Sequence, residues 1–135
     1  MSQFALPVRV YLEDTDAQGV VYNASYFRFL ERARTEWLRD HGIDHNVMRE
    51  QEGILLVLVG TEVRFVQPAR LDDMLFITAE LSELKWARFI FEQNVRRDAP
   101  DGEILCCGVA EVACMDVEQR KPRRVPAALI NELTE

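Results

Sequence analysis

The stretch that decides the fold of this chain runs from Glu13 to Asn23 and reads EDTDAQGVVYN. It follows a segment in which apolar and polar residues alternate, as in a half-buried strand, and it leads into a segment with the apolar period of a helix. Three carboxylates and a glycine therefore stand where a strand gives way to a helix. Because the first N–H groups of a helix have no partner within it, a carboxylate beside them is placed to act on a polarised carbonyl group.

The segments around this stretch predict one long helix, two short helices and a set of strands. An apolar stripe predicts the long helix over residues 24–39, capped by Asn23 or Ser25 and ending near Gly42. Short helices are expected at residues 45–51 and 126–133. Strands are expected at residues 8–12, 54–59, 61–66, 74–84, 86–97 and 103–117, with turns at 68–73 and 98–102. The wholly aliphatic run 54–59 predicts a strand that is buried on both faces.

This order of elements favours the α+β class, in which a mostly antiparallel sheet packs against one principal helix. The length of 135 residues fits a single domain over residues 1–135. A single covering helix leaves one sheet face and the sheet edges in need of a partner. We therefore expect a homo-oligomer.

Composition and charge narrow the functional classes. Hydrophobic residues make up 48% of the chain and charged residues 29%, as in a soluble globular protein. The formal net charge of −7 argues against nucleic-acid binding. The odd number of cysteines, two of them adjacent, gives no disulfide framework and indicates a reducing compartment. The first six residues do not resemble a signal peptide, and no run approaches the ~20 apolar residues of a membrane span, so we expect a cytoplasmic protein.

The motif at the strand–helix junction also carries a family resemblance. The pattern D-x-D-x-x-G-V-V-Y, with Tyr26 four residues on, resembles the signature of the hot-dog-fold acyl-CoA thioesterases. Within them the chain is most similar to the 4-hydroxybenzoyl-CoA thioesterase family, in its YbgC-type, Tol–Pal-associated branch. The likeness covers nearly the whole chain and includes VRVYLEDTD from Val8, ASYFRFLERARTE from Ala24, PARLDD from Pro68 and KPR from Lys121.

This resemblance implies a hot-dog fold, a mostly antiparallel sheet wrapped on one long central helix. It also implies dimers that join their sheets and often pair into tetramers, and it carries the family's catalytic carboxylate to Asp16. Beside the helix N-terminus, Asp16 would attack the thioester carbonyl as a nucleophile or activate a water as a general base; the sequence does not choose. The backbone N–H near Asn23 would bind the thioester oxygen. YbgC-type relatives often have a histidine where this chain has Asn23.

The neighbouring residues of the motif are interpreted as supporting groups. Gly19 lets a ligand approach the backbone closely or takes a positive φ angle, and Tyr22 stands where the helix opens. Asp14 is interpreted as a structural acid of the turn. A metal site on the two aspartates is disfavoured because no glycine-rich phosphate loop accompanies them, so we expect no metal and no other cofactor.

A CoA ester is anionic, so an acidic chain needs a local basic patch to hold it. Lys85 and Arg88 flank a hairpin-like junction and are the first candidates for contacts with the CoA phosphates. The second candidates form a basic run: Lys121, Arg123 and Arg124. Trp37 and Trp86 are expected in the core or at an interface.

The sequence gives little support for a cysteine nucleophile, a serine hydrolase or a histidine metal site. The cysteines lie in an apolar strand and are expected in the core rather than as nucleophiles: Cys106, Cys107 and Cys114. The G-x-S-x-G elbow of a serine hydrolase is missing from the sequence. His41 and His45 are interpreted as loop residues, because Gly42 interrupts the helix between them and no third ligand is evident.

The sequence thus predicts an acyl-CoA thioesterase that converts short- to medium-chain acyl-CoA thioesters to the free acid and CoA. An acyl-carrier-protein thioester is an alternative substrate. A non-catalytic acyl-thioester-binding or scaffold protein of the same fold is the rival from another class. The carboxylate of Asp16 beside Gly19, which we expect to be buried, argues against that rival. A hot-dog dehydratase would need a histidine near the motif.

Overall fold

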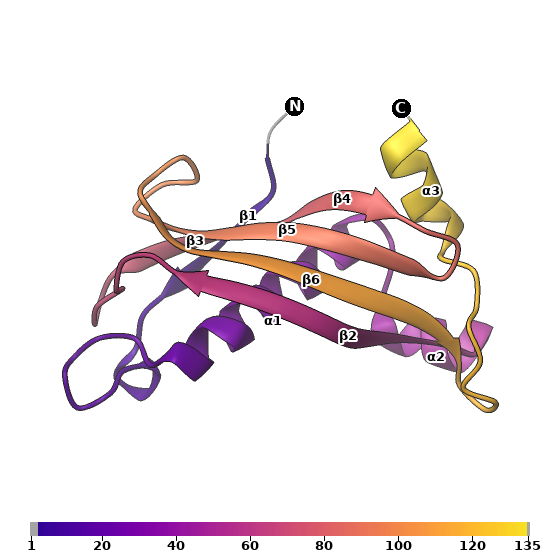
Figure 1. Cartoon of the computed structure of the whole chain (residues 1–135), viewed down its shortest axis with the longest axis horizontal. Coiled ribbons are helices and arrows are strands. Elements are labelled where there is room, and N and C mark those ends of the chain that lie inside the picture. The colour runs from indigo at the N-terminus through magenta and orange to yellow at the C-terminus, as the bar shows by residue number, and fades with distance from the viewer. Residues whose placement is uncertain (1–2, 135) are drawn as a thin grey trace.

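In residues 3–134, which the computed structural model describes, a six-stranded sheet carries one long helix on a face and two short helices near one end (Figure 1). The helices are α1 (Asn23–Asp40), α2 (His45–Glu52) and α3 (Ala127–Thr134), with a 3₁₀ turn, η1, at Leu12–Asp14. The strands are β1 (Ala5–Arg9), β2 (Ile54–Phe65), β3 (Met74–Thr78), β4 (Glu80–Leu84), β5 (Arg88–Arg97) and β6 (Ile104–Asp116). The described residues do not include 1, 2 and 135. The predicted domain contains all three, and the predicted lack of a signal peptide concerns the first two.

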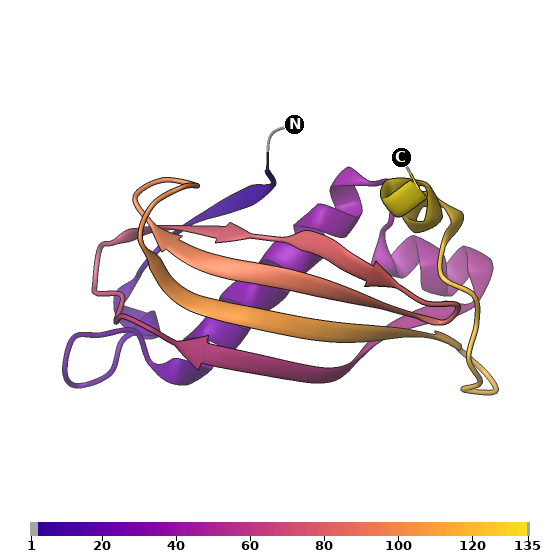
Figure 2. The ribbon, with the colours of Figure 1, turned by 45° about the horizontal axis from the view of Figure 1, so that its top comes forward.

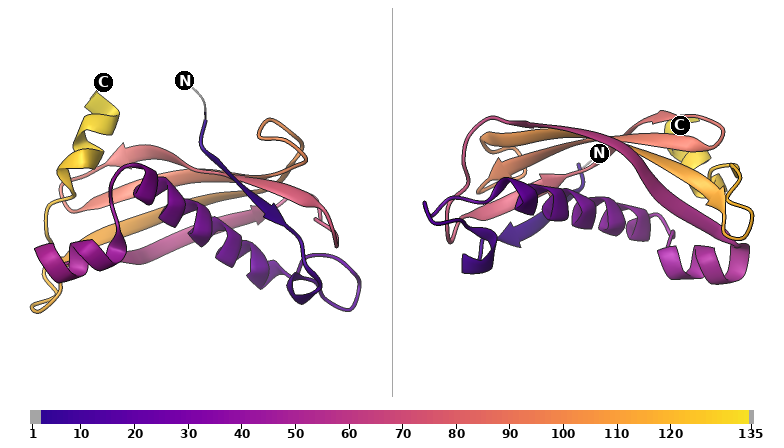
Figure 3. Two further views of the ribbon diagram at one scale, coloured as in Figure 1. Left: turned by 180° about the vertical axis from the view of Figure 1, so that it is seen from behind. Right: turned by 60° about the horizontal axis from the view of Figure 1, so that its bottom comes forward.

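The strands pair antiparallel in the order β1-β3-β5-β6-β2, and β4 pairs with β5 off this path. Figures 2 and 3 show α1 lying across one face of this sheet, with β2 at one edge. Among the described residues, no helix is both long and apolar enough to cross a membrane. The α+β arrangement predicted from the sequence is confirmed.

Two clusters of buried side chains join α1 to the sheet. The cluster on the first half of the helix includes Phe29 and Leu30, and the sheet comes so close there that a Cβ added at Gly108 would lie 3.3 Å from Leu30 Cδ1. The cluster on the second half includes Trp37, which meets Phe91 edge-on with ring centroids 5.1 Å apart. The apolar stripe that predicts the helix is therefore the surface that the sheet covers.

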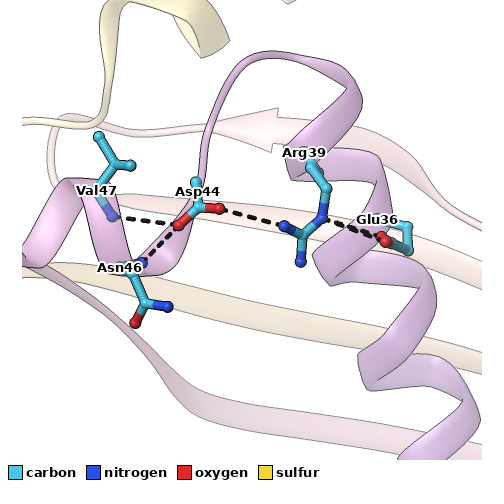
Figure 4. Close-up of polar contacts among 5 residues, drawn as sticks. All are labelled: Glu36, Arg39, Asp44, Asn46 and Val47. Carbon is cyan, nitrogen blue, oxygen red and sulfur yellow. Dashed lines mark hydrogen bonds and ion pairs between the residues drawn. The ribbon is translucent and has the colours of Figure 1, made fainter.

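The junction between α1 and α2 is held by Asp44 (Figure 4). Its Oδ1 atom accepts the backbone N–H groups of Asn46 at 2.8 Å and Val47 at 3.2 Å, which caps α2. Its Oδ2 atom accepts a hydrogen bond from Arg39 at 3.2 Å, and Arg39 also contacts Glu36. The backbone hydrogen bonds, that of Val47 first, favour the ionised carboxylate and hold the pKa of Asp44 below its usual value.

The three predicted helices agree with the structure to within one residue at each end, but the predicted cap of α1 is wrong. Tyr22 is the N-cap residue, and no side chain accepts a hydrogen bond as a cap there. The Ser25 hydroxyl instead donates to the carbonyl oxygen of Asp14 at 3.1 Å. The polar groups at the start of the helix thus hold the preceding loop rather than the helix end.

The first strand, predicted over residues 8–12, lies three residues earlier, at Ala5–Arg9, because the chain leaves the sheet after Arg9. The Asp14 carboxylate accepts the backbone N–H of Tyr11 at 2.9 Å and closes residues 12–14 into η1. Leu12, predicted to lie in the strand, is consequently 75% exposed. A side-chain hydrogen bond has taken the place of a pairing in the sheet.

Two strand boundaries in the middle of the chain also differ from the prediction. Residues 54–59 and 61–66 form essentially one strand, β2, with a register shift against β6 between Leu58 and Gly60. Because β2 is an edge strand, the predicted burial on both faces is wrong, and Leu58 is 46% exposed. The predicted strand 74–84 divides between β3 and β4, where the Thr78 hydroxyl replaces a backbone carbonyl and accepts the N–H of Asn94 at 2.9 Å.

Candidate active site

Residues 15–21 form a small hairpin between η1 and α1, and Asp16 lies at its turn. Thr15 and Val21 form an antiparallel bridge, the N–H of Asp16 donates to Val20 O at 2.9 Å, and the N–H of Gly19 donates to Asp16 O at 3.1 Å. Gly19 has a φ angle of +80°, which confirms the predicted positive angle. The backbone of the turn is thus fixed by its own hydrogen bonds.

The side chain of Asp16 is exposed in the single chain, so its expected burial is wrong. The hairpin extends beyond the edge of the helix and sheet (Figure 1). The Oδ1 atom of Asp16 accepts the backbone N–H of Gln18 at 2.8 Å. Its Oδ2 atom has no hydrogen-bond partner among residues 3–134. One carboxylate oxygen is therefore fixed and the other is open to a substrate or a water.

Asp14 anchors the hairpin to α1. The Asp14 carboxylate is buried and accepts a hydrogen bond from Arg28 Nη2 at 3.3 Å, besides the one from Tyr11. The carbonyl of Asp14 accepts the N–H of Tyr22 at 2.9 Å and the hydroxyl of Ser25. Asp14 thus has the structural role expected of it.

Tyr26 anchors the other side of the hairpin through the segment that follows β2. The phenolic oxygen of Tyr26 accepts the N–H of Ala69 at 3.0 Å, and Ala69 O accepts the N–H of Val21 at 2.8 Å. Burial raises the pKa of Tyr26, because the phenolate would lose its hydration, so the hydroxyl stays protonated. The positioning roles of Ser25, Tyr26 and Arg28 were not predicted from the sequence. Their common signal is a place on the first two turns of the helix that follows the motif.

Helix α1 begins immediately after the hairpin, and its first N–H groups belong to Asn23 and Ala24. They have no partner within the helix, and no side chain caps this end. The helix dipole adds partial positive charge here, which favours an oxygen that carries negative charge. Asn23 and Tyr22 are both exposed. The hairpin and helix start thus bring four predicted site residues together: Asp16, Gly19, Tyr22 and Asn23.

The two predicted CoA-binding cations lie far from this group within one chain. Arg88 begins β5, whereas Arg97 ends it and donates to Pro68 O at 2.7 Å, beside the segment that holds the hairpin. The intervening strand spans about 30 Å. Lys85 Nζ and Arg88 Nη1 both approach Glu111 Oε2, at 4.0 Å and 3.4 Å.

The turn between β4 and β5 carries Trp86 between these cations. Trp86 is 62% exposed in the single chain, so a place in the core is wrong for it, whereas Trp37 is buried as expected. The second basic run lies near the same end, since the N–H of Val125 donates to Trp86 O at 2.8 Å. Arg123 in that run forms an ion pair with Asp116 at 3.1 Å.

The buried cysteines fit a role in the core. Burial raises the pKa of the Cys106 thiol to about 12 and that of the Cys114 thiol to about 11. A thiol must ionise to act as a nucleophile, so these two are unreactive near neutral pH. In the part of the chain that the structure describes, no three His, Cys, Asp or Glu side chains form a group that could hold a metal ion.

Comparison with known proteins identifies the family. A family model described as the thioesterase-like superfamily matches residues 10–133. The chain belongs to this superfamily. It is 41% identical over 123 residues to the acyl-CoA thioesterase YbgC of Haemophilus influenzae, over 91% of this chain and 88% of that relative. It is 40% identical over 129 residues to the acyl-CoA thioester hydrolase YbgC of Escherichia coli, over 96% of this chain and 94% of that relative.

A solved structure of a probable thioesterase has the same fold. The probable thioesterase from Bartonella henselae superposes with a TM-score of 0.83 and 37% sequence identity, over 93% of this chain and all (100%) of the other. These matches confirm the resemblance to YbgC-type thioesterases and the predicted hot-dog fold.

Proposed function

We propose that this protein is an acyl-CoA thioesterase in which Asp16 drives hydrolysis of a thioester bound at the start of α1. The observation that carries the proposal is a carboxylate fixed at a hairpin turn directly before an uncapped helix N-terminus. The acyl-CoA thioesterase and thioester hydrolase names of relatives about 40% identical over nearly the whole chain support it.

The chemistry follows from these two groups. Hydrogen bonds from the first N–H groups of α1, near Asn23, stabilise the negative charge that develops on the thioester oxygen. In one route the carboxylate of Asp16 adds to the carbonyl carbon, the CoA thiolate leaves, and water then hydrolyses the mixed anhydride. In the other route Asp16 takes a proton from a water that attacks the carbonyl carbon directly. Both routes yield a free acid and CoA, and neither needs a metal or a redox cofactor.

The first test is a thiol-release assay with acyl-CoA substrates from two to sixteen carbons. We expect turnover that is fastest with short to medium chains. The same acyl group on an acyl carrier protein compares the two carriers. Saturable binding of acyl-CoA without any thiol release would favour the non-catalytic scaffold protein instead.

We further propose that the protein assembles as a dimer, and as a dimer of dimers, in the cytoplasm. The observation is the edge strand β2, which exposes Leu58 and Val59 along a side that has no pairing strand among the described residues. Light scattering is expected to give two or four times the chain mass of 15.6 kDa. A stable, active species of the single-chain mass would contradict this.

Lys85 and Arg88 are proposed to bind the CoA phosphates. Since one chain places them about 30 Å from the end of β5 that lies near the hairpin, we propose that they serve the site of a neighbouring subunit. Exchanging both for alanine is expected to raise KM for acyl-CoA by roughly 5- to 150-fold, from ~0.5–1.5 kcal/mol for each partly exposed contact. The kcat should change little, because these contacts are the same in the ground and transition states.

A truncated acyl-pantetheine substrate is the control for this prediction, since it lacks the nucleotide and its KM should not change. A matched double variant exchanges Lys121 and Arg124 for alanine. If KM for acyl-CoA is unchanged in both double variants, the phosphates are bound elsewhere.

A further inference from the structure

Arg70 lies beside the hairpin at residues 15–21, in the segment that follows β2. Val20 of the hairpin and Arg70 form an antiparallel bridge. On the other side of Val20, its carbonyl oxygen accepts the backbone N–H of Asp16 at 2.9 Å. Asp16, Val20 and Arg70 therefore lie in one row across three adjacent extended segments.

The side chains of this row start from the same face of the three segments. Residues directly opposite each other in antiparallel segments point to one face, and the residues next to them in sequence point to the other. Val21 and Ala69 are buried in the core, whereas Asp16 and Arg70 are exposed and Val20 is half-buried. Because neighbouring strands lie ~4.8 Å apart, the backbones of Asp16 and Arg70 are separated by ~10 Å on this outward face.

The backbone of Arg70 is fixed, but its guanidinium is available to a ligand. The N–H of Arg70 donates to Asp73 Oδ2 at 2.9 Å, and Arg70 O accepts the N–H of Asp73 at 3.1 Å. In the described part of the chain, the guanidinium of Arg70 makes no hydrogen bond and no ion pair. The guanidinium groups of Arg28 and Arg97, which also lie around the hairpin, are instead bound to oxygen atoms of the protein.

We propose that Arg70 binds the pantetheine arm of the substrate, at the amide carbonyl farther from the thioester; this inference rests on the proposed thioesterase function. An aliphatic acyl chain offers a guanidinium no acceptor, whereas the pantetheine arm has two amide carbonyls. In an extended chain each bond advances by ~1.2 Å, so these two carbonyl carbons lie ~6 Å and ~11 Å from the thioester carbon. With the thioester at Asp16, the nearer amide lies over Val20 and the farther one lies beside Arg70.

The test measures KM and kcat of Arg70→Met with the hexanoyl thioesters of CoA, pantetheine and N-acetylcysteamine, the last of which keeps only the nearer amide. We expect KM to rise about 3- to 10-fold for the first two, which carry the farther carbonyl, and to stay within about twofold for the third. The kcat should change little, since the arm does not change during the reaction. Arg70→Lys keeps the charge without the forked donors and should give a smaller rise in KM.

Arg32→Met is the matched control, because Arg32 is an exposed arginine on α1 and its loss changes the net charge by the same amount. Its KM values should equal those of the wild type, and thermal unfolding checks that each variant is folded. An unchanged KM of Arg70→Met for the pantetheine thioester would overturn the proposal. An equal rise with the N-acetylcysteamine thioester would also overturn it, since Arg70 would then act on Asp16 or on the acyl group.

Failure of the proposed function would give a different result, namely no thiol release by the wild type from any of the three thioesters. Calorimetry with two thioethers that cannot be hydrolysed, S-hexyl-pantetheine and S-hexyl-N-acetylcysteamine, then makes the same comparison. Weaker binding of the pantetheine thioether alone by Arg70→Met would support the contact with the arm in the absence of catalysis. Equal binding by the variant and the wild type, or no binding by either, would overturn it.

Discussion

Replacing Asp16 with asparagine is expected to lower kcat by about 100-fold or more, the scale of a lost general base or nucleophile. The change keeps the size of the side chain, and the amide oxygen can still accept the N–H of Gln18. The hairpin should therefore keep its shape while the negative charge is lost. Thiol release from a medium-chain acyl-CoA measures the effect.

Glu13→Gln is the matched control for Asp16→Asn, because Glu13 is an exposed carboxylate three residues away on the same segment. Its kcat should stay close to that of the wild type. Circular dichroism checks that both variants are folded. A kcat for Asp16→Asn within about threefold of the wild type would mean that another group performs the reaction.

Phe91→Ala is expected to lower the free energy of unfolding by about 3–5 kcal/mol, the usual cost of removing a buried aromatic ring from a core. Phe91 is fully buried and makes edge-on contacts with Trp37 and Phe89, so its loss opens a hole between α1 and the sheet. Denaturation by urea measures the change.

Ile90→Ala is the control for this core substitution. Ile90 neighbours Phe91 on β5 but is only partly buried and points to the opposite face of the strand. Its loss should cost clearly less than that of Phe91. Equal losses in the two variants would contradict the assignment of the core to the α1 face of the sheet.

The helices could be predicted from the sequence because their signals are local. The apolar stripe of α1 has one period throughout, and Gly53, with a φ angle of +68°, ends α2 where the glycine predicts an end. The positive φ angle of Gly19 was likewise readable, since glycine favours a tight turn after two acids.

The remaining features depend on contacts between distant segments. Whether the aliphatic residues of β2 are buried depends on the position of the strand in the sheet, and an edge position is not encoded in their own pattern. The exposure of Asp16 follows from how far the hairpin extends past the sheet. The separation of Lys85 from Asp16 follows from the path of β5. The sequence motif around each residue does not predict the distance between the two.

The hairpin at residues 15–21 has a consequence for how such a protein can diverge. Its geometry is carried by backbone groups, since the N–H of Gln18, and not its side chain, binds the carboxylate of Asp16. The side chains of Ala17 and Gln18 are exposed at the tip. These two positions are therefore free to vary, proline at Gln18 excepted, while the reactive carboxylate stays where it is. Selection can thus alter what the tip touches without rebuilding the group that reacts.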